Sequence, residues 1–97
     1  MHLNEITDAL LEQAVRSQAD EFDTHNVIFW LARNQPREYA ADLYRSLEND
    51  GDPFDRLHNA VGRRLAELGD IVQQQHRKRV SLNVRGRDTP CEVWRRV

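Results

Sequence analysis

The C-terminal part of the sequence is rich in cationic side chains. Between His76 and Val97 there are seven Lys and Arg residues and two acids. Guanidinium groups donate hydrogen bonds in a planar fork that fits phosphate oxygens and guanine edges. A basic helix followed by a basic hairpin is one way to hold a nucleic-acid backbone, so this segment is the first candidate for a functional surface.

The two halves of the chain carry opposite charge. Residues 1–55 contain 12 of the 16 acids, whereas residues 56–97 contain 10 of the 14 Lys and Arg residues. This division fits a polyanion-binding surface, but oppositely charged halves also attract each other within one fold. The charge pattern by itself leaves both interpretations open.

Residue types that usually carry catalysis or bind metals are dispersed along the chain. No two histidines are spaced as i, i+4 and Cys91 has no thiol partner, so we expect no metal site. Cys91 alternates with Val93 on the apolar side of a predicted strand, where a structural cysteine belongs. The glycines are isolated, so no phosphate-binding loop is predicted. We therefore expect a protein that is not an enzyme, with no cofactor and no small-molecule substrate.

Length and composition indicate one domain in a reducing compartment. A chain of 97 residues has room for one modest core. Its longest apolar run, residues 27–32, is far too short to cross a bilayer, so no membrane association is expected. The N-terminus shows no basic segment followed by an apolar one, and a single cysteine cannot form an internal disulfide. We expect a cytoplasmic protein.

Hydrophobic periodicity predicts a first helix from Asn4 to about Ala19. One stripe of this helix is apolar, and its opposite side carries acids that fit a solvated face. The stripe consists of Leu3, Ile6, Leu10 and Ala14. Since this helix precedes the others, residues 1–21 are interpreted as an N-terminal helical extension and residues 22–97 as the domain. An apolar stripe needs a cover, which suggests a homo-oligomer formed through this helix or packing back onto its own domain.

Capping residues and prolines mark two further helices. Asp23 or Thr24 is a suitable N-cap for a helix that runs to about Arg33. Pro36 fits the first turn of a helix but not its interior, so the next helix is predicted over 36–47.

A fourth helix is predicted from Pro53 to Leu68. Asp52 is its N-cap, and Gly69 is its C-terminal stop. At about 100° per residue, the outer face of this helix is centred on Asn59 and Arg63.

Two alternating segments at the C-terminus predict a β-hairpin. Residues 80–85 and 91–97 alternate apolar and polar side chains, and residues 86–90 supply the turn. Residues 73–79 receive no assignment. The predicted core collects the inward positions of the helices and the hairpin: Ile28, Leu31, Leu43, Leu47, Phe54, Leu57, Val61, Leu65, Leu82, Val84 and Val93.

Three helices followed by a hairpin resemble a winged helix-turn-helix domain. The predicted fold class is α+β, mainly helical: a winged-helix-like three-helix core with a C-terminal β-hairpin and an extra N-terminal helix. The short junction at Pro36 leaves no room for the small strand that often separates the first two helices of this family, so a two-stranded sheet is expected.

The resemblance implies binding to double-stranded DNA in transcription regulation, with the fourth helix in the major groove and the hairpin on the neighbouring backbone. Bases would be faced by Arg56, Asn59 and Arg63, of which Asn59 suits adenine and Arg63 suits guanine. Phosphates would be contacted by Arg64, Arg77, Lys78, Arg79, Arg85 and Arg87. Asp52 and Asp55 lie where this helix would approach DNA, and acids repel phosphate. The alternative is a winged-helix docking or dimerisation module that does not bind DNA.

Overall fold

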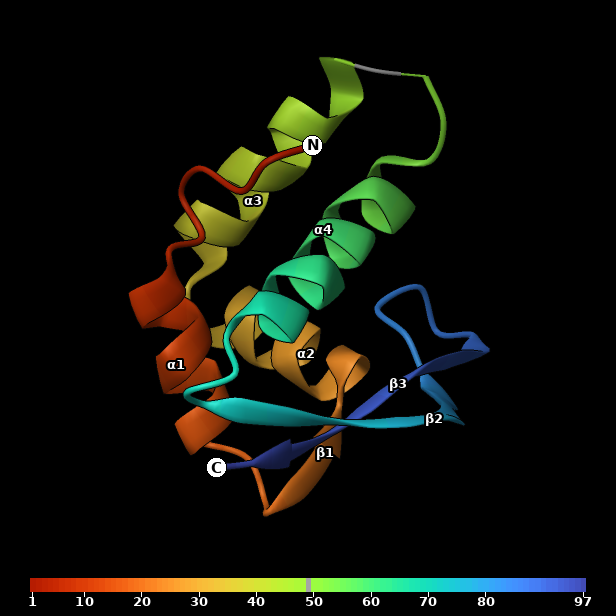
Figure 1. The fold of residues 1–97 in the computed structure, drawn as a ribbon. Coiled ribbons are helices and arrows are strands. Elements are labelled where there is room, and N and C mark those ends of the chain that lie inside the picture. Colours follow the sequence, from red (N-terminus) through yellow and green to blue (C-terminus); the bar gives the residue numbers. More distant parts are fainter. Residues whose placement is uncertain (49) are drawn as a thin grey trace.

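The computed structural model describes residues 1–48 and 50–97. Within them, the chain forms an α+β fold that is mainly helical, with four α-helices, one short 3-10 helix and a three-stranded antiparallel sheet (Figure 1). In chain order the elements are α1 (Asp8–Arg16), β1 (Glu21–Asp23), α2 (Thr24–Asn34), α3 (Pro36–Arg45), η1 (Ser46–Glu48), α4 (Pro53–Glu67), β2 (Val72–Leu82) and β3 (Asp88–Arg96).

α2 and α4 begin at the predicted caps, whereas α1 is shorter than predicted and is capped by Thr7. The Asp23 carboxylate accepts a hydrogen bond from the backbone N–H of Asn26 at 2.9 Å, and the Asn26 side chain accepts one from the Asp23 N–H, which completes a capping box at the start of α2. Asp52 caps α4 in the same way, by accepting from the N–H of Phe54. Prolines occupy the first turns of α3 and α4, as predicted.

The sheet has three strands, so the expectation of two is wrong. β3 lies in the middle, with β2 along one edge and the short β1 along the other. β1 was not predicted because it has only three residues and lies between α1 and α2. The small strand of the winged-helix family was considered only at the junction between α2 and α3, near Pro36. The backbone of β1 pairs with β3, which starts 65 residues after β1 ends.

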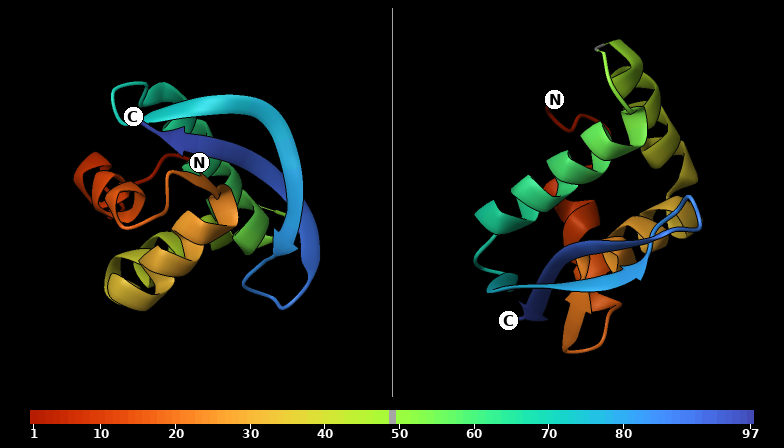
Figure 2. Two further views of the ribbon diagram at one scale, coloured as in Figure 1. Left: turned by 90° about the horizontal axis from the view of Figure 1, so that it is seen from below. Right: turned by 90° about the vertical axis from the view of Figure 1, so that its right-hand side faces the viewer.

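The hairpin is longer than predicted. β2 begins at Val72 and includes residues 73–79, and the connecting loop spans 83–87 instead of 86–90. The register shifts between Gln74 and Lys78, where His76 has a φ of 56°, so a bulge interrupts the pairing. Figure 2 shows the two strands bending together along their length.

The core lies between the helices and the sheet. Six predicted core residues are buried, namely Ile28, Leu31, Leu57, Val61, Leu65 and Val93. Leu43, Phe54 and Val84 are half-buried. Leu47 is 59% exposed, because α3 ends at Arg45 and the tighter 3-10 turn carries Leu47 out of the apolar stripe.

Leu82 is also exposed, by 51%, and Val80 is 66% exposed. The alternation in this strand is real, but its phase is the reverse of the expected one. Arg79 and Ser81 turn inward, where they bond to Asp23 and His25, and side chains alternate with a period of two. The hydrophobic residues between them must therefore face solvent.

Helix α1 belongs to the same core. Leu11, Ala14 and Val15 are fully buried and cluster with Phe22 and Trp94. The core therefore draws side chains from both sides of the boundary predicted at residue 21. The chain itself covers this stripe, which is the packing back onto its own domain expected as one of the two covers, and association through a partner helix stays a prediction.

Asp42 holds the segment that precedes α1. Its buried carboxylate accepts hydrogen bonds from the backbone N–H groups of Asn4, Glu5 and Ile6, at 2.9–3.2 Å. Along the residues that the structure describes, no helix is both long and apolar enough to cross a membrane.

Candidate nucleic-acid interface

A groove of about 520 Å³ lies between α4 and the β2–β3 hairpin. Three of the predicted nucleic-acid-binding residues line it: Asn59 and Arg63 from α4, and Lys78 from β2. All three are exposed. The fold thus brings one cation of the hairpin to the same groove as the outer face of α4.

The outer face of α4 follows from its amphipathic sequence. Leu57, Val61 and Leu65 are fully buried on one side, and Asn59 and Arg63 are exposed one helical turn apart on the other. This part of the prediction is confirmed. The groove also contains amide and hydroxyl groups that were not predicted as binding residues, from Gln74, Asn83 and Thr89.

Arg64 is engaged within the molecule. Its guanidinium binds the Asp8 carboxylate of α1 at 2.6 Å and the Glu67 carboxylate at 2.7 Å. The hydrogen bonds from Arg64 hold the pKa of Asp8 below its ordinary value. Arg64 therefore joins α4 to α1, and a phosphate would have to compete with two acids for it.

Three hairpin arginines are paired as well. Arg77 binds Glu21, and Arg85 binds Asp52. Arg79 donates to the Asp23 carboxylate at 2.7 Å and to Asn26 at 3.0 Å.

The Arg79–Asp23 pair differs from the others because the Asp23 side chain is only 1% exposed. Burial acts to raise the pKa of Asp23, but hydrogen bonds from Arg79, Asn26 and Ser81 outweigh it, so the pKa lies below its ordinary value. Asp23 is therefore a carboxylate whose charge is balanced mainly by Arg79.

The last two predicted contacts lie outside the groove. Arg56 is half-buried with its guanidinium beside Gly51, and its Nε atom is buried without a hydrogen-bond partner among the described residues. Arg87 is exposed on the loop between β2 and β3. The side-chain oxygen of Asn83 accepts the N–H groups of Arg85 and Arg87 and so shapes this loop.

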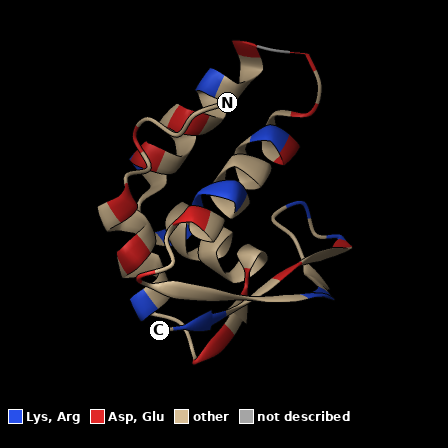
Figure 3. Cartoon of the chain, viewed as in Figure 1, with Lys and Arg blue, Asp and Glu red and all other residues tan. Residues whose placement is uncertain are grey.

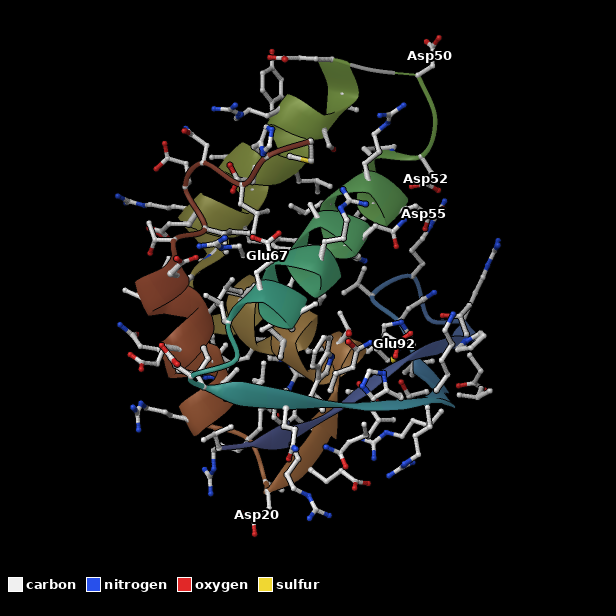
Figure 4. The ribbon with its side chains drawn as sticks, viewed as in Figure 1. Asp20, Asp50, Asp52, Asp55, Glu67 and Glu92 are labelled. Carbon is white, nitrogen blue, oxygen red and sulfur yellow. The ribbon has the colours of Figure 1, made fainter. Side chains whose placement is uncertain are left out.

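Acidic groups share the groove with these cations. Asp55 of α4 and Glu92 of β3 line it, and Figure 4 shows Glu92 on the hairpin below α4 and Asp52 and Asp55 at the beginning of α4. In Figure 3, the charged positions of the β2–β3 loop are basic. By sequence, α1 carries two acids and one arginine, and α3 carries two acids and two arginines. The positive surface is therefore interrupted by Asp55 and Glu92.

His58 lies against the groove in a neutral, aromatic environment. Its Nε2 is 2.8 Å from the hydroxyl of Tyr39, and Phe54 meets its ring edge-on. Burial lowers the pKa of His58 to about 4 and raises the pKa of Tyr39 to about 12. A neutral phenol and an uncharged imidazole therefore share this hydrogen bond at neutral pH.

A cluster that sequence reasoning missed lies beside the groove. A carboxylate oxygen of Asp23, a ring nitrogen of His25 and the sulfur of Cys91 lie within 4.8 Å of one another. Ser81 is in contact with the same cluster, because its Oγ is 2.7 Å from His25 Nδ1 and 3.7 Å from Cys91 Sγ. No spacing rule signals this group, since its members come from β1, α2, β2 and β3.

Comparisons with known proteins add no relative. No protein-family model, no curated protein and no solved structure matches this chain.

Proposed function

We propose that this protein binds double-stranded DNA as a winged-helix module and acts in transcription regulation in the cytoplasm. The observation that best supports this proposal is the groove lined by Asn59 and Arg63 of α4 and by Lys78 of the hairpin. In this arrangement Asn59 and Arg63 of α4 contact base edges in the major groove of DNA. The phosphate backbone beside that DNA groove passes Lys78 and continues toward the β2–β3 loop.

The order of elements supports this proposal. Three helices, α2 to α4, precede the β2–β3 hairpin, and the short strand β1 lies before the first of them and pairs with β3. α4 then leads directly into the β2–β3 hairpin, as a recognition helix leads into a wing.

The ion pairs within the chain reduce the number of predicted binding residues that are available to contact DNA. Within the described residues, Arg63, Lys78 and Arg87 are exposed and make no ion pair. The other predicted phosphate contacts, Arg64, Arg77, Arg79 and Arg85, are paired to acids of the same chain. The proposal therefore assigns binding to Asn59, Arg63, Lys78 and Arg87, and intramolecular roles to the paired arginines.

Neighbouring arginines on α4 provide a matched test. Arg63 lines the groove and Arg64 binds Asp8, so Arg63→Ala and Arg64→Ala remove the same group from adjacent positions. Arg63→Ala is expected to weaken binding to a preferred duplex by about 1–3 kcal/mol and to relax sequence preference. Arg64→Ala should leave DNA affinity nearly unchanged and lower stability by at most about 1 kcal/mol, since its pairs are exposed.

Fluorescence anisotropy with labelled duplexes selected from a random pool measures both the DNA affinity and the sequence preference of each variant. Arg87→Ala is expected to weaken all duplexes alike, because a phosphate contact carries no sequence information. Equal losses in Arg63→Ala and Arg64→Ala would contradict the assignment of the groove.

A docking module is the second candidate, and specific observations favour it. Asp55 and Glu92 place negative charge in the groove, and the outward side chains of Val80 and Leu82 form an exposed apolar pair on β2. In this case duplex DNA binds weakly and without sequence preference. Substitution of Val80 and Leu82 by threonine then abolishes capture of a protein partner without changing the fold.

A further inference from the structure

Three side chains of different chemistry converge beside the groove. Asp23 ends β1, His25 lies in the first turn of α2, and Cys91 lies on the central strand β3. Their carboxylate oxygen, ring nitrogen and sulfur lie within 4.8 Å of one another. Oxygen, nitrogen and sulfur ligands together are typical of zinc sites, which use Asp, His and Cys side chains.

We propose that Asp23, His25 and Cys91 bind one divalent transition-metal ion of the zinc class. Ligands lie about 2.0–2.3 Å from a tetrahedral zinc ion, so two ligands of one ion are about 3.3–3.7 Å apart. The three atoms, which lie within 4.8 Å of one another, therefore need to approach one another by roughly 1 Å to share an ion.

Ser81 marks the point on which the ligands converge. Its hydroxyl is 2.7 Å from His25 Nδ1 and 3.7 Å from Cys91 Sγ. The hydroxyl oxygen becomes the fourth ligand or rotates away and leaves that position to water. The other ring nitrogen of His25 is 3.4 Å from Thr89 Oγ1, an outer contact of the kind that orients metal-bound histidines.

The charge of the cluster is balanced in two alternative ways. Without metal, Arg79 provides the positive charge next to Asp23. When the ion binds, the Cys91 thiol loses its proton to solvent, and the ion takes over as the partner of Asp23. Arg79 and the metal therefore compete for one carboxylate, and binding releases the Arg79 guanidinium toward the hairpin surface.

An ion has a path to this site. Cys91 is half-buried, and both Cys91 and His25 line the groove, which is open to solvent. Asp23 forms the buried end of the cluster.

Cobalt(II) titration of the reduced full-length protein tests the proposal, because Cys91 is the sole cysteine of the sequence. A thiolate-to-cobalt charge-transfer band can therefore arise only from Cys91. The band is expected to saturate at one equivalent of cobalt per chain, to disappear on addition of zinc and to be absent in Cys91→Ser. A missing band overturns the proposal. Saturation at half an equivalent also overturns it, since the ion would then bridge two copies.

Two pairs of variants test the other ligands. His25→Gln should weaken cobalt binding at least about tenfold, because even the loss of a residue that only contacts a metal ligand lowers metal affinity by about 10–100-fold. His2→Gln, at an exposed position, should leave the affinity for cobalt unchanged. Arg79→Gln should strengthen binding about tenfold by removing the competing cation, whereas Arg77→Gln, which breaks a more exposed pair, should not. Circular dichroism shows whether each variant is folded. Equal affinities in folded Arg79→Gln and Arg77→Gln proteins would refute the competition for Asp23.

Discussion

Acidification is expected to destabilise the protein through His58 before it affects the paired carboxylates. Burial lowers the pKa of His58 to about 4, whereas in the unfolded chain the imidazole has its ordinary pKa of 6.5. Between these two values the unfolded state binds a proton at His58 that the folded state does not. The free energy of unfolding therefore falls as the pH falls through this window and is independent of His58 at higher pH.

The size of this effect follows from the shift. A difference of about 2.5 pKa units corresponds to a loss of roughly 3 kcal/mol when the pH is well below both values. Between about pH 7.5 and about pH 5 the loss is about 2 kcal/mol, because the folded state remains almost unprotonated at this site. For Asp8, Glu21, Asp23 and Asp52 the pKa is lowered in the folded state, so their stabilisation is lost only at still lower pH.

Urea denaturation at these two pH values measures the effect, with His58→Gln as the comparison. The glutamine variant keeps an amide that can accept the Tyr39 hydroxyl, but it has no group that titrates in this range. It should therefore lack the loss of about 2 kcal/mol. The reasoning is refuted if both proteins lose equal stability, or if the imidazole proton resonances of His58 titrate near the ordinary pKa of 6.5 instead of near 4.

Two further predictions concern the fold itself. Asp42→Ala should lower the free energy of unfolding by roughly 2–4 kcal/mol, because the backbone N–H groups of residues 4–6 lose a charged acceptor and that of Ile6 is buried. Asp42→Asn, which keeps one acceptor oxygen, should cost less, and equal urea midpoints for wild type and Asp42→Ala would contradict this role. Leu82→Thr should change stability by less than about 0.5 kcal/mol, whereas Leu57→Ala should cost about 2–5 kcal/mol. A large loss in Leu82→Thr would show that this side chain is not at the surface.

The sequence predicted the elements whose signals are local. Asp23 and Asp52 cap helices through hydrogen bonds to residues two or three positions away, so their role can be identified within a short window. The outer face of α4 was predicted for the same reason, because helical periodicity places Asn59 and Arg63 opposite Leu57 and Val61.

The sequence did not predict the positions of residues that depend on a partner far away along the chain. β1 is held by pairing with β3, which no local pattern indicates. The phase of β2 was reversed because Arg79 and Ser81, although polar, are drawn inward by Asp23 and His25. The same long-range contacts paired several candidate arginines to acids and assembled the cluster around Cys91.

The salt dependence of DNA affinity tests the proposed function most directly. The exposed cations without an ion pair among the described residues that are assigned to DNA are Arg63, Lys78 and Arg87. With about two phosphates neutralised, by Lys78 and Arg87, a plot of log K against log salt concentration should have a slope of about −2. Arg87→Ala should reduce the magnitude of the slope by about one, whereas Arg64→Ala should leave it unchanged. A slope near zero for the wild-type protein would contradict DNA binding through this groove.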